Sequence, residues 1–321
     1  MRAIRHHAFG SPDVLVLDEV PDLHPGAGEV RIAVEASGVH LLDTTLRRGE
    51  TGGPLPPPEL PTVPGREVAG VVDALGDGVD PAWAGRRVVA HLGMVPGGYA
   101  EQAVTTEDRL FAVPDAVSLP DAVVAVGTGR TALGIVELEP AGAGDVVLVL
   151  SAAGGLGWLL VQSTLAAGAV VVAAARGAER TAALTALGCT VVDYGEPGWE
   201  ATVPAVSLVY DGVGGALGRT ALELLRPGGR LVMFGYSAGE PTRFDSGDVV
   251  ERGLTVGWSL GPRMAALPGG IPGLAGRALA RVAAGDWRPL VTSYPLAEAA
   301  LAHADLEGRR ALGKVVLVSH R

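Results

Sequence analysis

Cysteine is almost absent from this chain of 321 residues, which contains only Cys189. A single thiol cannot form an internal disulfide, and it cannot supply the clustered thiolates of a structural zinc site. Cys189 follows a predicted helix over residues 179–188 and precedes an apolar strand. We therefore expect a packed thiol rather than a nucleophile, because lone cysteines usually behave as small hydrophobic residues.

Basic residues and long apolar runs are also scarce. The 25 Lys and Arg residues are outnumbered by 35 Asp and Glu, which gives a formal net charge of -10. This balance disfavours nucleic acid and anionic membranes as partners. No uninterrupted apolar run reaches the roughly 18 residues of a membrane span, and no signal-peptide core follows Met1. We expect a soluble, cytoplasmic protein.

The length and the texture of the sequence indicate an α/β protein with two domains. Residues 1–121 contain short strand-like runs between glycines and prolines, such as 30–34, 68–72 and 87–90, which predict a β-rich region. A stiff surface loop is predicted over 49–64 and could border a substrate site. It carries six prolines, at positions 54, 56, 57, 58, 61 and 64.

Residues 122–258 change to apolar strands followed by helix-length segments, with strands expected at 146–150, 170–174, 190–193, 208–211 and 231–235. This alternation predicts βαβ units and a doubly wound parallel sheet of the Rossmann type. Residues 259–321 return to the first texture, with helices expected at 274–284 and 296–306 and a closing strand at 314–319.

A glycine-rich turn follows the first strand of the parallel region. The sequence SAAGGLG at 151–157 ends a strand and opens an apolar helix at Trp158. Backbone amides at such a turn can approach a pyrophosphate at the positive end of the helix. Gly154, Gly155, Leu156 and Gly157 are therefore predicted to bind a dinucleotide, although Ala152 replaces the first glycine of the usual pattern.

The end of the second strand indicates which dinucleotide is bound. An acidic residue there would accept hydrogen bonds from the ribose of NAD, but the chain has Arg176 and, one turn later, Arg180. Two guanidinium groups favour a 2′-phosphate, so NADPH is the predicted cofactor. The alternative is that both arginines are solvated helix charges, and Glu179 could pair with either.

Eight segments in order along the chain resemble the medium-chain dehydrogenase/reductases, within the zinc-independent quinone oxidoreductase and enoyl reductase branch. They are GAGEV (26–30), GVHLLD (38–43), VPGREVAG (63–70), GGYAE (97–101), the glycine-rich turn, YDGVGG (210–215), RPGGR (226–230) and GKVV (313–316). The resemblance implies a GroES-like substrate domain formed by residues 1–121 and completed by residues 259–321, a Rossmann cofactor domain inserted into it, and an active site in the cleft between them. It further implies cofactor contacts by Thr128, Tyr194, Val213, Gly235, Tyr236, Ser237 and Lys314, although Lys314 could equally be a surface charge.

The same resemblance indicates whether the protein can bind a catalytic zinc ion. At the positions of two zinc ligands in the metal-dependent relatives, this chain has His40 and Arg66, and the fixed cation of Arg66 would repel a metal ion. We expect no metal, and therefore reduction of an already polarised acceptor rather than alcohol oxidation. The predicted substrate is a quinone or an α,β-unsaturated carbonyl.

The resemblance places His40 beside the nicotinamide, where the zinc-free branch usually has Asn. His40 could donate a hydrogen bond or a proton to the substrate oxygen, or it could be a buried structural histidine. Asp43 could orient the site. Tyr99 and Tyr236 are alternative acids, since Thr45 replaces a tyrosine of the family pattern. Two alternative functions stay open: an enoyl-thioester or polyketide-type enoyl reductase, and a non-catalytic NADPH-binding protein. A homodimer is expected through the apolar strand at 254–258.

Overall fold

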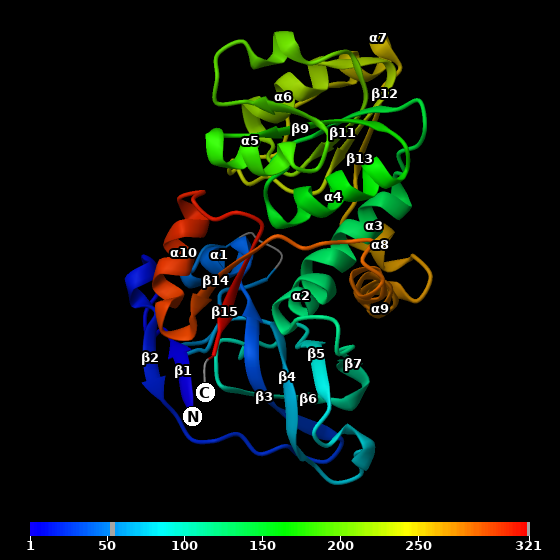
Figure 1. Cartoon of the computed structure of the whole chain (residues 1–321). Coiled ribbons are helices and arrows are strands. Elements are labelled where there is room, and N and C mark those ends of the chain that lie inside the picture. Colours follow the sequence, from blue (N-terminus) through cyan, green and yellow to red (C-terminus); the bar gives the residue numbers. More distant parts are fainter. Residues whose placement is uncertain (52–54, 320–321) are drawn as a thin grey trace. The chain divides into compact units, whose positions relative to one another are not determined.

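The computed structural model describes residues 1–51 and 55–319, which form two compact units (Figure 1). The split unit comprises Met1–Gly129 and Ala275–Arg321, and the continuous unit comprises Arg130–Leu274. These boundaries fall later than the sequence-based ones after residues 121 and 258. Helix α2 (Leu119–Val124) packs on strands β3 and β4 of the split unit, and α8 (Pro262–Ala265) packs on α3 (Arg130–Leu138) of the continuous unit.

The split unit is built on a seven-stranded sheet with the order β14-β15-β3-β4-β5-β7, in which β6 also pairs with β3. The strands are β3 (Glu29–Gly38), β4 (Glu67–Leu75), β5 (Arg87–His91), β6 (Gln102–Thr106), β7 (Leu110–Ala112), β14 (Val291–Pro295) and β15 (Lys314–Val318). All pairs are antiparallel except β14 with β15. A separate ribbon pairs β1 (Arg2–Arg5) with β2 (Val16–Glu19).

The register of this sheet brings three strand ends together. Strand β3 ends at Gly38 beside the starts of its two antiparallel neighbours, because Gly38 pairs with Val316 of β15 and Ser37 pairs with Val68 of β4. Residues just beyond the end of β3 therefore meet the first residues of β15 and β4. His40, Lys314 and Glu67 occupy those three positions.

Helices surround that edge of the sheet. Helix α1 (Leu41–Arg47) begins directly after β3 and packs against α10 (Ala299–Glu307), while α9 (Gly270–Ala283) contributes Ala275 and Leu279 to the core beside α2 (Figure 1). A short π-helical turn over Ala125–Gly129 follows α2. Short 3-10 turns occupy Pro12–Val14, Pro81–Trp83, Glu107–Arg109, Trp199–Thr202 and Leu296–Glu298.

One helical run, Leu119–Leu138, is long and apolar enough to cross a membrane, but 72% of its most apolar window is buried inside the protein. Such burial is typical of a core helix. Asp121, Arg130 and Glu137 interrupt this run in the sequence, which is why a search for unbroken apolar stretches does not find it.

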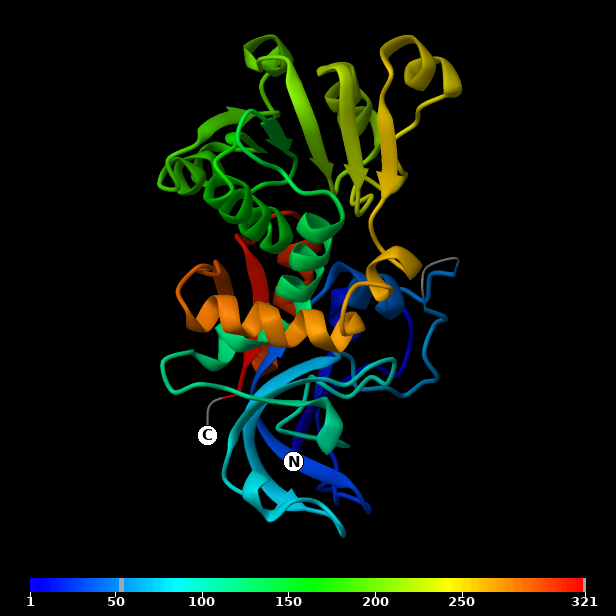
Figure 2. The same cartoon turned by 90° about the vertical axis from the view of Figure 1, so that its right-hand side faces the viewer.

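The continuous unit contains six parallel strands in the order β10-β9-β8-β11-β12-β13 (Figure 2). This order is that of a Rossmann sheet, so the predicted fold class is confirmed. The strands are β8 (Val146–Val149), β9 (Val170–Ala175), β10 (Thr190–Asp193), β11 (Val206–Asp211), β12 (Leu225–Met233) and β13 (Thr255–Trp258). The remaining helices are α4 (Gly155–Ala166), α5 (Ala178–Thr185), α6 (Gly215–Glu223) and α7 (Ser246–Arg252).

Cys189 lies between α5 and β10 as a half-buried thiol. Its Sγ is 3.7 Å from the carbonyl oxygen of Leu184, and burial raises the pKa of the thiol. A thiol that holds its proton more tightly is a poor nucleophile. This environment agrees with the packing role expected from the sequence.

Candidate functional site

The three residues at the converging strand ends form one polar cluster. His40 precedes α1, and its Nε2 lies 2.5 Å from Oε1 of Glu67 and 2.6 Å from Nζ of Lys314. The Lys314 ammonium is 3.2 Å from the other carboxylate oxygen of Glu67. A single ring nitrogen cannot both donate to Glu67 and accept from Lys314, so the cluster has two proton arrangements. When Lys314 donates to Nε2, the ring proton of neutral His40 sits on Nδ1.

His40 is the accessible member of this cluster. Its side chain is 30% exposed, whereas Glu67 and Lys314 are 1% and 5% exposed. The side chains of His40 and Asp43 also form a capping box at the start of α1, each accepting from the other's backbone amide. The structure therefore holds the ring in place and leaves part of it accessible to a ligand.

Glu67 is a buried carboxylate whose charge is balanced by its neighbours. Burial alone would raise its pKa, but the electrostatic effect of His40 and Lys314 and a hydrogen bond with His40 outweigh burial, so the pKa of Glu67 lies well below its usual range. Two glycines leave room for the carboxylate. A Cβ on Gly38 would lie 2.3 Å from Oε2 of Glu67, and one on Gly127 would lie 2.0 Å from Oε1. Any larger side chain at either position would displace the carboxylate.

The resemblance gave Lys314 as either a cofactor contact or a surface charge. Its side chain is only 5% exposed, so the surface charge is wrong, and its ammonium contacts Glu67 and His40. Burial lowers the pKa of Lys314, and the carboxylates of Glu67 and Asp43 oppose that shift. Thr128 belongs to the same neighbourhood, because it is a buried residue of the π-helical turn directly after Gly127.

Asp43 joins His40 to a second buried chain of polar groups. Its Oδ2 accepts hydrogen bonds from the backbone N–H of His40 at 2.8 Å and from the hydroxyl of Tyr99 at 3.1 Å. Tyr99 is also 3.2 Å from Nε2 of His303, while Nδ1 of His303 is 3.4 Å from Arg47. Since arginine only donates, Nδ1 of His303 accepts and Nε2 carries the proton.

This series of hydrogen-bonded groups holds Asp43 in place and makes Tyr99 unsuitable as a proton donor. Tyr99 is fully buried, and burial together with Asp43 raises the pKa of its hydroxyl well above the usual range. Burial lowers the pKa of His303 to about 4, so that imidazole is neutral near pH 7. The second alternative acid, Tyr236, lies in the continuous unit with its ring centroid 6.3 Å from that of Trp258.

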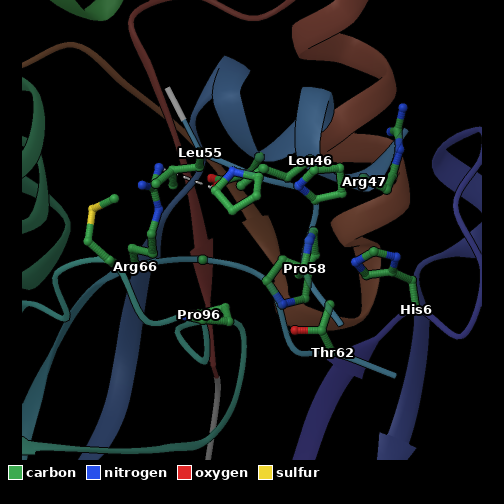
Figure 3. A pocket seen from close by; sticks show the side chains of 14 residues that line it. His6, Leu46, Arg47, Leu55, Pro58, Thr62, Arg66 and Pro96 are labelled. Atoms are coloured by element: carbon green, nitrogen blue, oxygen red, sulfur yellow. Dashed lines mark ion pairs between the residues drawn. The ribbon is translucent and has the colours of Figure 1, made fainter. Parts of the chain in front are cut away.

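A cavity of about 250 Å³ opens within the split unit beside Asp43 (Figure 3). Arg66 lies in its wall, with its guanidinium 3.8 Å from Oδ1 of Asp43. The other lining residues are mostly apolar: Leu46, Leu55, Pro56, Pro57, Pro58, Pro64, Met94 and Pro96, together with His6, Arg47, Thr62 and Gly65. The proline-rich loop therefore borders a cavity, and Pro54 lies outside the described residues.

The glycine-rich turn follows β8 as predicted. Ser151 adopts a left-handed backbone with φ 51°, and α4 begins at Gly155 without a side-chain cap. The first amides of an α-helix have no acceptor within the helix, so those of Gly155, Leu156 and Gly157 remain available to a ligand. Gly157 is required by close packing, because a Cβ there would lie 2.3 Å from the carbonyl oxygen of Ser151.

The tip of β9 differs in one respect from the sequence-based expectation. Arg176 is exposed, and Arg180 donates to the carbonyl oxygen of Arg176 at 3.4 Å. The expectation of no carboxylate at this tip is wrong, because Asp193 reaches it from the adjacent parallel strand β10. Its two carboxylate oxygens accept from the backbone amides of Gly177 at 2.8 Å and Gly195 at 2.7 Å. Parallel strands end at the same edge of a sheet, and this juxtaposition is invisible in the local sequence.

The other predicted cofactor residues lie in loops after the strands of the continuous unit. Tyr194 follows β10 and packs edge-on against Trp199. Val213 is buried after β11, where its carbonyl oxygen accepts from Ala238 at 2.8 Å. Gly235, Tyr236 and Ser237 follow β12, and the amide of Ser237 bonds to Gly212. The loops after β11 and β12 are thus hydrogen-bonded to each other.

Comparison with known proteins gives full-length relatives. The alcohol dehydrogenase GroES-like domain family matches residues 26–115, and a family described as zinc-binding dehydrogenase matches residues 187–317. The chain is 30% identical over 327 residues to a quinone oxidoreductase from Pseudomonas aeruginosa, with 99% of each protein covered. It is 31% identical over 328 residues to a 2-haloacrylate reductase from a Burkholderia species, with 97% of each covered.

A solved structure agrees with these relatives. The quinone oxidoreductase of Escherichia coli in complex with NADPH has a TM-score of 0.86 and 27% identity, and the match covers 99% of this chain and 100% of that one. Within the described residues, no group of three or more His, Cys, Asp or Glu side chains is arranged to hold a metal ion. The chain belongs to the zinc-independent quinone oxidoreductase branch of the medium-chain dehydrogenase/reductase family.

Proposed function

We propose that this oxidoreductase uses NADPH to reduce a quinone or an α,β-unsaturated carbonyl without zinc. The observation that carries the proposal is the placement of His40. Glu67 and Lys314 hold its Nε2, and the ring is partly exposed, so that it can meet a substrate oxygen. A positioned donor stabilises the negative charge that develops on that oxygen during reduction.

The continuous unit fits the cofactor. The uncapped start of α4 offers backbone amides from Gly155, Leu156 and Gly157 to a pyrophosphate. Arg176 and Arg180 supply positive charge for a 2′-phosphate, and each carboxylate oxygen of Asp193 at the same tip accepts one backbone amide. We assign further contacts to Gly154, Tyr194, Val213, Gly235, Tyr236 and Ser237, and to Thr128 of the split unit.

The protein's part in the reaction is to bind, orient and polarise. When bound, NADPH supplies a hydride to the electron-poor carbon of the acceptor. His40 polarises the acceptor oxygen with a ring N–H, while Lys314 and Glu67 fix the ring and Asp43 fixes the backbone at residue 40. The proton that completes the product comes from water.

The proposal is tested by following NADPH oxidation with three acceptors: a simple quinone, a short enone and an enoyl thioester. The assay is run after dialysis against a strong chelator. Reduction of the quinone or the enone by the dialysed protein supports the proposal. Turnover of the thioester alone would favour an enoyl-thioester reductase. Tight NADPH binding without reduction of any acceptor would favour a non-catalytic binding protein.

Replacement of Arg176 by alanine is expected to weaken NADPH binding about tenfold and to leave NADH binding unchanged. The reason is that a charge-assisted bond to the 2′-phosphate contributes on the order of 1.5–3 kcal/mol. Calorimetric titration of both cofactors measures the effect. Arg243→Ala is the matched control, because Arg243 is an exposed arginine of the same unit that pairs with Glu240. Equal affinity of the unmodified protein for NADPH and NADH would contradict the assignment.

We also propose a homodimer formed through β13. This strand is at the edge of the parallel sheet, and its unpaired backbone groups can continue the sheet into a symmetric partner. Light scattering at micromolar concentration measures the mass directly, and a monomer at that concentration would exclude the dimer.

A further inference from the structure

Arg66 has a guanidinium that the protein does not satisfy. Its side chain is 12% exposed, and its buried Nε has no hydrogen-bond partner in the part of the chain that the structure describes. Its nearest acidic group is Asp43, at 3.8 Å, which is beyond hydrogen-bond distance. Guanidinium donors that are buried without acceptors are costly, so an arginine held in this way is suited to an acceptor supplied by a ligand.

Asp43 is already committed to other groups. Its Oδ2 accepts from the backbone of His40 and from the hydroxyl of Tyr99. Arg47, the second arginine of the cavity wall, differs from Arg66. Its guanidinium bonds to the carbonyl oxygen of Gly10 at 3.1 Å and to Glu307 at 2.7 Å, so Arg47 has a structural role. Arg66 is the arginine of this wall that is open to a ligand.

The cavity beside Arg66 limits what that ligand can be. Its volume of about 250 Å³ is below the roughly 300–1,000 Å³ of typical ligand pockets, so the ligand is small. Pro56, Pro58 and Leu55 give the cavity an apolar wall, and in Figure 3 the Arg66 side chain extends along the side of the cavity that holds Leu55. Proline and leucine side chains offer no hydrogen bonds. A short ligand with an apolar body and one anionic end matches these walls.

From these observations we infer that Arg66 binds the carboxylate of the acceptor, and that the preferred substrates are short α,β-unsaturated carboxylic acids. This inference rests on the proposed function and narrows it. The planar fork of Arg66 donates two N–H groups to the two carboxylate oxygens. Asp43 links the two ends of the site, because Oδ2 bonds to the backbone of His40 and Oδ1 faces Arg66.

Pairing of the substrate carboxylate with Arg66 also makes the double bond easier to reduce. A free carboxylate is a poor activating group, because its negative charge opposes the arrival of a hydride at the conjugated double bond. The guanidinium offsets that charge. Hydride from NADPH then bonds to the β-carbon, the electron pair of the double bond moves toward the carboxylate, and the α-carbon takes a proton from water. NADPH is oxidised to NADP⁺ and the acid is reduced to its saturated form.

The test compares crotonate with crotonamide, its neutral analogue of the same size. The unmodified protein is expected to reduce crotonate with a kcat/KM at least about tenfold higher than that for crotonamide. Arg66→Met should lower the value for crotonate roughly 100-fold and that for crotonamide less than about threefold. Arg66→Lys keeps the charge but not the planar fork. Its kcat/KM for crotonate should therefore lie between the values of the unmodified protein and of Arg66→Met. Arg86→Met is the control, because Arg86 is an exposed arginine of the same unit.

A binding measurement separates this inference from the proposed function. Butanoate, the saturated acid, should raise the melting temperature of the unmodified protein and of Arg86→Met but not that of Arg66→Met. If the protein reduces a quinone or an enone but shows no preference for crotonate and no stabilisation by butanoate, the role of Arg66 is refuted and the proposed function stands. If it reduces no acceptor, the proposed function fails, while stabilisation by butanoate that depends on Arg66 would still establish the anion site.

Discussion

Replacement of His40 by alanine is expected to lower the turnover number roughly 10- to 1000-fold while NADPH affinity stays within about twofold. The reason lies in the geometry around the ring. Nε2 is held between Glu67 and Lys314, and the partly exposed ring can reach a substrate oxygen. A donor at that place acts mainly on the charge that develops in the transition state, and its loss therefore affects turnover more than binding.

His40→Asn distinguishes catalysis from packing. An amide can also donate at this position, so the asparagine variant should recover much of the lost turnover. A thermal melt of both variants accompanies the kinetics. Normal turnover in His40→Ala combined with a lower melting temperature would make His40 a structural residue and would remove it from the mechanism.

Glu67→Gln is expected to reduce the free energy of unfolding by about 3–5 kcal/mol, which is the usual cost of breaking a buried ion pair from one side. Glutamine preserves the size of the side chain between Gly38 and Gly127 but leaves the buried ammonium of Lys314 without its counter-charge. Chemical denaturation measures the loss. In a double-mutant cycle, Lys314→Met should cost less in the Glu67→Gln background than alone, and strict additivity would mean that the two charges do not interact.

The acid dependence of stability provides a second measure of the same carboxylate. Because the folded state lowers the pKa of Glu67, the carboxylate contributes stability that is fully present above the pKa of an unfolded glutamate, about 4.3. That contribution is lost as the pH falls through the lower, folded-state pKa. Glu67→Gln should therefore lose less stability than the unmodified protein as the pH is lowered below about 4. Identical acid dependence of the two proteins would argue against a lowered pKa.

The fold was largely predictable, because each strand carries its own signal. The apolar runs at 146–150, 170–174 and 190–193 became β8, β9 and β10 with ends shifted by at most one residue. The strand expected at 231–235 instead covers Leu225–Met233. Leu225 pairs with Val206 and Arg230 pairs with Leu208, so residues of the segment RPGGR bulge out of the pairing with β11, with Gly228 at φ 77°.

The site was only partly predictable, because its residues are distant in the sequence. His40 and Asp43 were recognised from one local segment. Their partners Glu67 and Lys314 lie 27 and 274 residues from His40, and the sequence alone does not reveal that the three meet. The glycines at 38 and 127 were a usable signal, because both leave space for one buried carboxylate. Asp193 was missed at the tip of β9 for the same reason, since it belongs to the next strand.

The placement of Lys314 at the start of the closing strand also constrains the order in which the protein can be assembled on the ribosome. The continuous unit is one uninterrupted segment and can fold once residues 130–274 have emerged. The split unit lacks β15 and the counter-charge of Glu67 until residues 314–318 have followed. A growing chain therefore completes the parallel-sheet unit before the cluster around His40, and β15 both joins β14 to β3 and supplies the ammonium that contacts His40.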